Sequence, residues 1–547
     1  SVTVRFLVDG KERAKTSFRP SYEAGPGRFR YGRPAASRIV VLAGPEGGVA
    51  ELVRSDGGGS SGDEYDAAAI SARIERIDQL PIEWYGYEGI DELVLTTSRP
   101  EFYRPLAQNR ARVDALVAWI ARGGRATVFC GASAEELFGE KGPLAPLAPG
   151  KLSGMAPLRD SQPLESFSES EDLLDSRLLD LRVPLWEEVA GRVLAYGRRN
   201  PPGLPLVVRS RQGFGEITFV GLDPESPPLS NWKGRGAFLR RALGWPSRTA
   251  ADEQLAANAH SGAGYEDLSN QLRSALDQKF ADVETAPFGL VALLVVAYIA
   301  LIGPGDYFLV KHVLKRMELT WITFPLIVVG TSLAAYFLAN AYKGDKLRVN
   351  QVEIVDVDVA AGEARGTVWT HFFNPRVQRY DLTLAPRFAG AQVEGADRLA
   401  GWLGLAGAGL GGMQGSGSAL PELRPSYAFA AGLDAISGAP VQEWSTKSIT
   451  ARWYGVVEPG IDAQLGLLDE ELLTGSIANR TSLDWSDVLL MHDRWAYRLS
   501  RIPAGGSAAI DENQKNSTVK LRLTAATAGD GGSGSGTRLR IAGTDCR

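Results

Sequence analysis

The feature that most constrains this chain is a pair of apolar segments near its middle, Ala286–Gly303 and Leu319–Tyr342. Neither segment contains a charged side chain. A helix rises about 1.5 Å per residue, so each segment is long enough to cross a hydrocarbon core of roughly 30 Å. Two such runs with a short loop between them predict a transmembrane helical hairpin over residues 286–342. We therefore expect the chain to be held in a lipid bilayer, with both large polar regions on one side of it.

The short loop between the apolar segments predicts which side that is. It carries Lys311, Lys315 and Arg316 beside His312, and basic residues in short loops tend to stay on the cytoplasmic side. Both polar regions are therefore expected to be extracytoplasmic, because the opposite orientation would translocate the basic loop. Gly303-Pro304 is expected to end the first span, with Asp306 capping a short helix over Tyr307–Met317. Export of the amino-terminal region needs a signal peptide or an earlier span, so we interpret the opening SVTVRFLVDG as a processed or truncated end.

Composition argues against several classes of function. Charged residues make up 22% of the chain and the net charge is −5, which does not indicate a nucleic-acid surface. The two cysteines, Cys130 and Cys546, are too few for a disulfide framework. The four histidines show no spacing typical of a metal site. Walker and Gly-x-Ser-x-Gly motifs are missing from the sequence, and no cofactor is predicted.

Residues 38–246 are predicted to form an α/β domain. Continuous apolar runs at Ile39–Leu42, Asp91–Thr96 and Ala126–Cys130 are typical of strands that are buried on both faces. A helical pattern over Val113–Ile120 ends at Gly123-Gly124, where glycine suits the helix end. Strand, helix and strand with short connections predict a doubly wound parallel sheet. The sheet is expected to continue at Leu206–Val208 and Ile217–Gly221, after a β-rich insertion over about Leu152–Arg199.

The remaining segments are divided at changes of composition. Residues 1–37 carry one alternating strand, Val2–Val8, which we interpret as the remnant of an amino-terminal β-domain. Residues 247–285 are predicted to be a linker and a juxtamembrane helix, because apolar residues recur every fourth position up to Phe280. Residues 343–547 show short strands without helical periodicity, which predicts a β-sandwich. The predicted fold class is thus multidomain, α/β plus all-β, with a transmembrane hairpin between the two.

Two strand ends of the α/β region carry residue types that can act in catalysis, a cysteine at one and two carboxylates at the other. The first reads Ala-Thr-Val-Phe-Cys-Gly-Ala up to Ala132, and the second reads Phe-Val-Gly-Leu-Asp-Pro-Glu-Ser up to Ser226. They resemble the class I glutamine amidotransferase family, in which a nucleophilic cysteine follows a buried strand and a later strand ends in Gln-Phe-His-Pro-Glu. The resemblance implies a flavodoxin-like fold. It places Cys130 and Glu225 at family positions, and Asp223 where the family has its histidine.

That departure argues against thiol catalysis. A thiol with its usual pKa needs a positioned base or cation, and the first 259 residues contain no histidine. A carboxylate near Cys130 would disfavour the thiolate, because like charges repel. We therefore interpret Cys130 as a small buried residue, and Asp223 and Glu225 as turn and cap residues that could still bind a cation or a partner's basic group. The alternative is a thiol-dependent amidase or hydrolase that uses Cys130.

The whole architecture resembles a group of bacterial two-span membrane proteins. These carry an amidotransferase-like domain, a hairpin that reads close to IGPxDYFLxK and TWxTFPLIV, and a carboxy-terminal β-domain. This chain matches at Ile302–Lys311, Thr320–Val328 and Leu473–Asn479. The resemblance implies the bacterial inner membrane and an accessory subunit of an envelope or transport complex. The leading hypothesis is a non-catalytic scaffold or binding subunit, a pseudoenzyme with envelope protein partners. A further alternative is a solute-binding accessory of a transporter, which would use the carboxyl edge of the parallel sheet.

Overall fold

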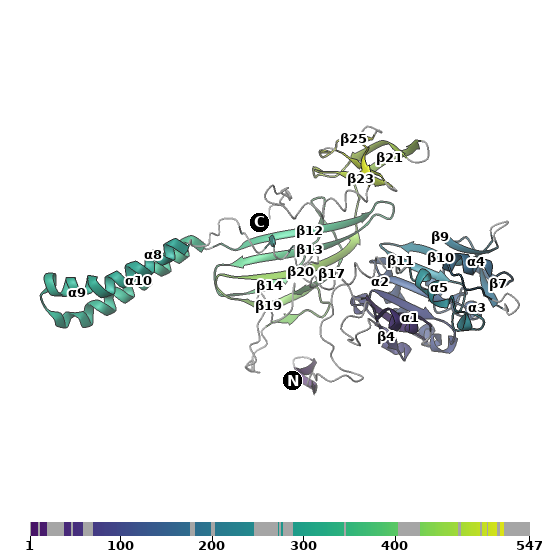
Figure 1. Ribbon diagram of the computed structural model, residues 1–547, viewed down its shortest axis with the longest axis horizontal. Helices are drawn as coiled ribbons and strands as arrows, with labels where there is room; N and C mark the ends of the chain where they lie inside the picture. The colour runs from purple at the N-terminus through teal and green to yellow at the C-terminus, as the bar shows by residue number, and fades with distance from the viewer. Residues whose placement is uncertain are drawn as a thin grey trace. The chain divides into compact units, whose positions relative to one another are not determined.

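The computed structural model gives a mixed α/β fold in two compact units, Ser1–Tyr265 and Glu266–Arg547, which are described separately (Figure 1). The described residues are 2–8, 11–18, 38–44, 48–57, 69–174, 181–198, 203–245, 288–343, 346–402, 427–468, 472–492, 495–499, 501–510 and 515–518, together with 272, 275, 276 and 280. The predicted linker over 247–264 and most of the predicted juxtamembrane helix lie outside them.

A seven-stranded sheet forms the centre of the first unit, among the residues that the structure describes. Its order is β4-β3-β5-β6-β11-β10-β9. The strands are β3 (Arg38–Ala43), β4 (Ala69–Ile74), β5 (Glu92–Thr96), β6 (Arg125–Phe129), β9 (Arg192–Arg198), β10 (Gly203–Gln212) and β11 (Gly215–Val220). Pairs from β4 to β11 are parallel, which confirms the parallel core that the apolar runs predict.

The last two pairings of this sheet are antiparallel, whereas the sequence predicts a parallel sheet. β10 pairs antiparallel with both β11 and β9. The reason is the length of the connection: only Gly213 and Phe214 separate β10 from β11, whereas parallel neighbours need a crossover of a dozen or more residues. Gly213 has a φ of +59°, and a Cβ there would lie 2.4 Å from the Ala121 carbonyl oxygen. Glycine is therefore required at this turn.

Helices cover both faces of the sheet (Figure 1). They are α1 (Gly48–Gly57), α2 (Arg110–Ala121), α3 (Ala134–Phe138), α4 (Gln162–Ser168) and α5 (Arg235–Ala242). One buried cluster contains residues of α1, α4 and α5, and another contains residues of α2 and α3. On β5, Val94 packs in the first cluster and Leu93 in the second, as the alternation of a strand requires. The sequence pattern predicts α2, but it does not predict α1 or β4.

The predicted insertion is confirmed in part. β7 (Lys151–Leu158) and β8 (Leu181–Glu187) form a separate antiparallel pair, with α4 between them in the chain. β9 lies within the predicted insertion but belongs to the main sheet. At the amino terminus the predicted strand is β1 (Val2–Val8), which pairs with β2 (Lys11–Phe18) in a hairpin. That this hairpin is the remnant of a larger domain stays a prediction.

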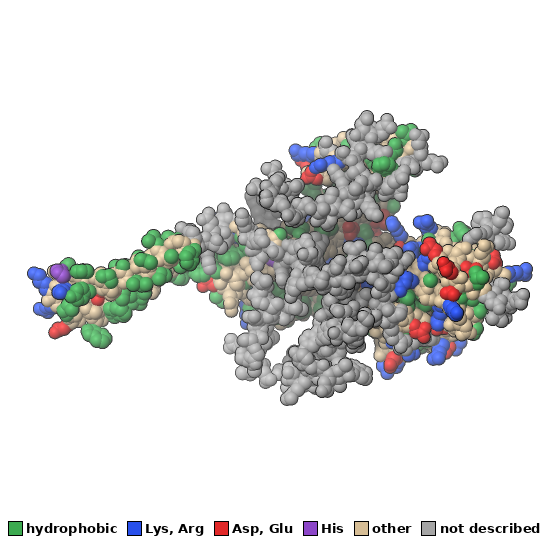
Figure 2. All heavy atoms as spheres, in the orientation of Figure 1, with side chains coloured by type: hydrophobic (Ala, Val, Ile, Leu, Met, Phe, Trp, Pro, Cys, Tyr) green, Lys and Arg blue, Asp and Glu red, His purple; other side chains and the backbone are tan. Residues whose placement is uncertain are grey.

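Two helices of the second unit are long and apolar enough to cross a membrane, Phe288–Leu314 and Met317–Leu338. The first contains α8 (Phe288–Ala300), a π-helical turn at Leu301–Gly305, α9 (Asp306–Phe308) and a second π-helical segment, Leu309–Leu314; the second contains most of α10 (Thr320–Lys343). Their shafts are covered with hydrophobic side chains, and basic and histidine side chains gather at the turn between them (Figure 2).

The expected end of the first span at Gly303-Pro304 is wrong. The helix continues through Pro304 to Leu314 and ends at Lys315, whose φ of 52° is left-handed. Proline cannot donate the helical hydrogen bond and its ring crowds the preceding turn, and the π-helical turn at this point accommodates that irregularity. Asp306 is a residue of the helix interior rather than its cap: it makes no capping hydrogen bond, and its side chain is buried. The predicted short helix over Tyr307–Met317 is therefore not separate: its residues up to Leu314 belong to the longer helix, and Met317 begins a 3₁₀ turn before α10.

The described strands after α10 pair antiparallel, and the sequence predicts β-structure in this region. Its described strands form the sheets β12-β13-β20-β17, β14-β19-β18, β15-β16, β21-β22-β25 and β23-β24-β26. Their bounds are β12 (Arg348–Asp358), β13 (Glu363–Asn374), β14 (Gln378–Thr383), β15 (Arg387–Phe388), β16 (Ala391–Gln392), β17 (Asp397–Trp402), β18 (Ala428–Phe429), β19 (Ala435–Val441), β20 (Ser445–Val456), β21 (Ile461–Leu468), β22 (Leu472–Asn479), β23 (Leu489–His492), β24 (Trp495–Arg498), β25 (Ser507–Ile510) and β26 (Lys515–Thr518).

These strands enclose separate hydrophobic clusters. One gathers around Val368 and Trp453, and another around Ile477 and Tyr497. His371 of β13 is buried, and its Nδ1 lies 2.7 Å from the Ser448 hydroxyl of β20. That all of residues 343–547 form one β-sandwich stays a prediction.

Candidate functional site

Cys130 lies directly after β6, at the carboxyl end of the parallel strands, where the sequence places it. Its side chain is fully buried, in the cluster under α2 and α3. Its backbone N–H donates to the Val220 carbonyl oxygen of β11 at 2.8 Å. Burial raises the pKa of the Cys130 thiol, against a hydrogen bond with Thr97 that lowers it, and the charge of Asp223 raises it further. The thiol is therefore protonated and inaccessible, which are the properties of a structural cysteine.

Asp223 follows β11 and is bound by its own turn. One carboxylate oxygen accepts hydrogen bonds from the Ser98 hydroxyl at 2.8 Å and from the backbone N–H of Glu225 at 3.0 Å. The other accepts from the Ser226 hydroxyl at 2.6 Å. A Cβ at Gly131 would lie 2.8 Å from the Asp223 Cβ, so the turn approaches the Cys130 segment closely. These contacts agree with the turn role that the sequence predicts for Asp223, and they show why it repels a thiolate.

Glu225 binds the amino terminus of α1. Its carboxylate accepts the backbone N–H of Gly48 at 2.9 Å, and the Arg235 Nη2 atom lies 2.7 and 2.8 Å from its two oxygens. The first N–H groups of a helix lack partners within the helix and carry partial positive charge. Glu225 therefore supplies a carboxylate at the point where a fold of this type would bind an anionic ligand. A Cβ at Gly48 would lie 2.4 Å from the Arg235 guanidinium, so a larger residue there would have to displace this side chain.

At the carboxyl ends of β3 and β5, too, a side chain of the protein uses the polar groups of the backbone. β4 lies on one side of β3 and β5 on the other, so this is the switch point where doubly wound sheets bind ligands. Here the hydroxyl of Tyr103, which is fully buried, lies 2.6 Å from the Ala43 carbonyl oxygen and 3.0 Å from that of Thr96. Side chains of the protein thus occupy the crevice and use its polar groups.

The structure brings Cys130, Asp223 and Glu225 to one edge of the sheet, as the sequence predicts, but it does not assemble them into a catalytic triad. Each has its own surroundings: a buried cluster, a serine-lined turn and a helix amino terminus. Sequence reasoning missed Ser98, Tyr103 and Arg235, which make these contacts. Their separation in the chain from their partners left no local signal. Among the described residues, no group of histidine, cysteine and acidic side chains has the geometry of a metal site.

The basic residues that predict membrane orientation gather at the end of the hairpin. Lys311 lies in the last turns of the first helix, where its Nζ atom is 2.7 Å from the Tyr307 hydroxyl and 5.0 Å from the centre of that ring. Lys315 ends the helix and Arg316 follows in the turn. The charged end is therefore more compact than the loop that the sequence predicts, but it keeps all three basic side chains.

Comparisons with known proteins give structural likeness only. No protein-family model matches the chain, and no curated protein matches it. A cytoplasmic protein from Salmonella typhimurium LT2 is 14% identical, and the match covers 38% of this chain and 98% of that protein with a TM-score of 0.25. A putative ThuA-like protein from Bacteroides uniformis ATCC 8492 is 11% identical, with 41% and 95% covered and a TM-score of 0.25. An exo-beta-1,4-mannosidase from Opitutaceae bacterium strain TAV5 is 14% identical, with 40% and 37% covered and a TM-score of 0.25.

Proposed function

We propose that this chain is a membrane-anchored, non-catalytic scaffold or binding subunit of a bacterial envelope or transport complex. Its first unit would have a degenerate amidotransferase-like fold, and the two apolar helices would anchor it in the inner membrane. Its partners are then the lipid bilayer and envelope proteins, and nucleic acid is not among them. The β-rich part and the α/β unit would both be presented outside the cytoplasm.

One observation carries the non-catalytic part of this proposal: the groups at the carboxyl edge of the sheet are already used by the protein. Cys130 is fully buried, Asp223 accepts hydrogen bonds at both carboxylate oxygens, and Glu225 occupies the first N–H of α1. A thiol hydrolase needs an accessible thiolate next to a base. The enzyme alternative would therefore require this edge to rearrange before substrate could reach Cys130.

The reactivity of the Cys130 thiol tests the proposal. In purified full-length protein with Cys546→Ser, we expect Cys130 to be alkylated by iodoacetamide at pH 8 at least about 100-fold more slowly than an accessible thiol, because both access and thiolate fraction are reduced. The matched control is Leu173→Cys in a background of Cys130→Ala and Cys546→Ser, since Leu173 is 79% exposed. Equal rates at the two positions, together with a glutaminase or amidase activity that Cys130→Ala abolishes, would overturn the non-catalytic role.

Membrane orientation has a separate test. In a background without the two native cysteines, single cysteines replace Val313, near the turn of the hairpin, and Val377, in the β-rich part; these residues are 69% and 77% exposed. Spheroplasts are treated with a membrane-impermeant maleimide, and lysed cells serve as the control in which both sites react. The basic turn predicts labelling at 377 and protection at 313. Labelling at 313 with protection at 377 would reverse the orientation.

A further inference from the structure

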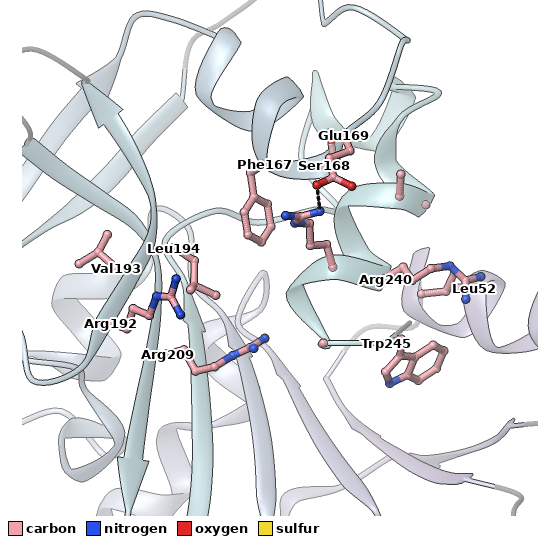
Figure 3. A pocket seen from close by; sticks show the side chains of 14 residues that line it. Leu52, Phe167, Ser168, Glu169, Arg192, Val193, Leu194, Arg209, Arg240 and Trp245 are labelled. Atoms are coloured by element: carbon pink, nitrogen blue, oxygen red, sulfur yellow. Dashed lines mark ion pairs between the residues drawn. The ribbon is translucent and has the colours of Figure 1, made fainter. Parts of the chain in front are cut away.

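A second site lies at the opposite end of the same sheet. It is a pocket of about 910 Å³ lined by residues of β9, β10, α1, α4 and α5, by Glu169 after α4, and by Gly244 and Trp245 after α5 (Figure 3). None of Cys130, Asp223 and Glu225 lines it. Its volume falls in the range of small-molecule sites, which is roughly 300–1,000 Å³. The pocket is therefore separate from the carboxyl edge that supports the proposed function, and the inference below does not depend on that function.

Arginines dominate the charge of this pocket. Arg192, Arg209, Arg240 and Arg241 line it, and Glu169 is the one acid among the described residues that do so. Glu169 already forms an ion pair with Arg241, whose guanidinium also lies 5.7 Å from the centre of the Phe167 ring. The other described residues of the lining are uncharged. The walls thus carry a surplus of positive charge.

Arg192 and Arg209 form the most unusual part of the pocket. They are directly opposed in the register of β9 and β10, and their side chains enter the same space below Phe167 (Figure 3). Opposed residues of an antiparallel pair have Cβ atoms about 5 Å apart, and like charges there are destabilising. Among the described residues, no acidic side chain forms an ion pair with Arg192. Arg192 is exposed and Arg209 is half-buried, so a ligand in the pocket can reach both guanidinium groups.

The nearest acid to this pair is already shared. The Glu216 carboxylate lies 3.5 Å from the Nε atom of Arg209 and 3.6 Å from the Nη2 atom of Arg125. A Cβ at Gly244 would lie 3.1 Å from Arg209 and 3.2 Å from Arg125, so both guanidiniums crowd the same point. One carboxylate thus serves two arginines, and Arg192 adds a third positive charge beside them.

The other walls are apolar. Phe167 and Leu194 line the pocket, and the buried indole of Trp245 directs its N–H away to the Glu92 carboxylate at 3.0 Å. Inorganic phosphate alone would fill only a small part of the volume. A ligand that used the whole pocket would combine an anionic group with an organic body.

We propose that this pocket binds an organic phosphate ester, or a comparable dianion, with its anionic group between Arg192 and Arg209 and its body against Phe167 and Leu194. Guanidinium groups bind phosphate and carboxylate oxygens through paired, charge-assisted hydrogen bonds. A dianion would neutralise the opposed pair, which explains why both arginines occur in this register. The same chemistry occurs in soluble phosphate esters and in lipid headgroups.

Calorimetric titration of the purified full-length protein in a non-ionic detergent distinguishes these sources. The soluble probe is glycerol 3-phosphate, and the lipid probe is dihexanoyl phosphatidic acid below its micelle concentration. We expect saturable binding of at least one probe, and we expect Arg192→Gln and Arg209→Gln each to weaken it at least about fivefold. Arg192→Lys should weaken it less, because lysine keeps the positive charge but cannot form the paired hydrogen bonds of a guanidinium. The matched control is Arg182→Gln, at an exposed arginine of β8 outside the pocket, which should leave binding unchanged.

The relative affinities of the two probes show which part of the ligand the pocket recognises. Similar affinity for both probes assigns recognition to the phosphate group, whereas preference for one probe assigns the body of the ligand as soluble or lipid. Circular dichroism and melting of each variant show whether it is folded. The inference is overturned if neither probe binds saturably to folded wild-type protein, or if folded Arg192→Gln and Arg209→Gln variants bind as tightly as Arg182→Gln.

Discussion

The polar side chains at the two ends of the parallel strands differ in whether they have partners within the protein. At the carboxyl end, Glu225 binds Arg235 and the first N–H of α1, and Asp223 accepts from two hydroxyls and an amide. At the amino end, Arg192 and Arg209 oppose each other across a pocket, and the nearest carboxylate is shared with Arg125. Polar groups that bind one another stabilise the fold and leave little for a ligand. Among the described residues no acid forms an ion pair with Arg192, and Arg209 shares its carboxylate, so these charges favour an external anion and the unexpected end is the better candidate for binding.

The largest expected effect is at the carboxyl end. Glu225→Gln would leave the Arg235 guanidinium, whose side chain is only 15% exposed, without its counter-charge. Breaking a largely buried pair from one side should lower the free energy of unfolding by about 2–3 kcal/mol. Urea unfolding followed by tryptophan fluorescence measures this change. The control is Glu136→Gln in the exposed Arg104–Glu136 pair, which should leave the transition where it is. Equal shifts in the two variants would show that the Glu225 contact is not structural.

The hydroxyl of Tyr103 gives a second test of the same end. Tyr103→Phe keeps the ring but removes the donor near the carbonyl oxygens of Ala43 and Thr96. A buried acceptor left without its partner costs about 1–2 kcal/mol. Tyr85→Phe is the matched control, because no hydrogen bond joins the Tyr85 hydroxyl to a described residue. A Tyr103→Phe variant as stable as its control would mean that water or a relaxed backbone replaces the bond.

The amino end has a pH dependence of its own. Burial raises the pKa of the Glu92 carboxyl, and hydrogen bonds from Thr127 and Trp245 lower it in part. The folded state thus favours the protonated form. The stabilisation from Glu92 is complete below its unfolded pKa of about 4.3 and is lost as pH rises through the folded value.

Glu92→Gln should remove this dependence. Relative to wild type, the variant should become progressively more stable as pH rises from about 4 to 7. Melting curves across that range measure the difference, and Glu101→Gln at an exposed position is the control. If the Glu92→Gln and wild-type curves stay parallel at every pH, then Glu92 keeps its ordinary pKa in the folded protein.

The smallest effect belongs to the opposed arginines. At low ionic strength and without ligand, Arg192→Gln should raise the free energy of unfolding by a few tenths of a kcal/mol, because it relieves a like-charge pair. The gain should disappear in about 1 M salt, where charges are screened within about 3 Å. Arg182→Gln serves again as the control. A loss of stability in Arg192→Gln would instead assign Arg192 a stabilising partner and remove the contrast between the two ends.

Local patterns predict much of the α/β unit. Val40–Leu42 and Ala126–Cys130 are buried in their strands because side chains on both faces must avoid water, although Ile39 at the start of the first run is exposed. β4 reads Ala-Ile-Ser-Ala-Arg-Ile, which is too polar for that signal because it is an edge strand. The first apolar helix also continues beyond its predicted end, because a π-helical turn accommodates Pro304. Periodicity reports burial, but it does not report where a helix tolerates an irregular turn.

The sequence by itself determined the two apolar helices, the parallel core, the antiparallel β-structure and the place of Cys130 at a strand end. Each of these depends on hydrophobic periodicity, which is local in the chain. Only the tertiary structure decided which polar groups meet. Gly48, Glu225 and Arg235 come together across almost 190 positions, and Arg192 meets Arg209 only because a short turn makes β10 antiparallel to β11 and leaves β9 as its other neighbour. Such contacts depend on topology and register, because charge interactions act between neighbours in space rather than in sequence.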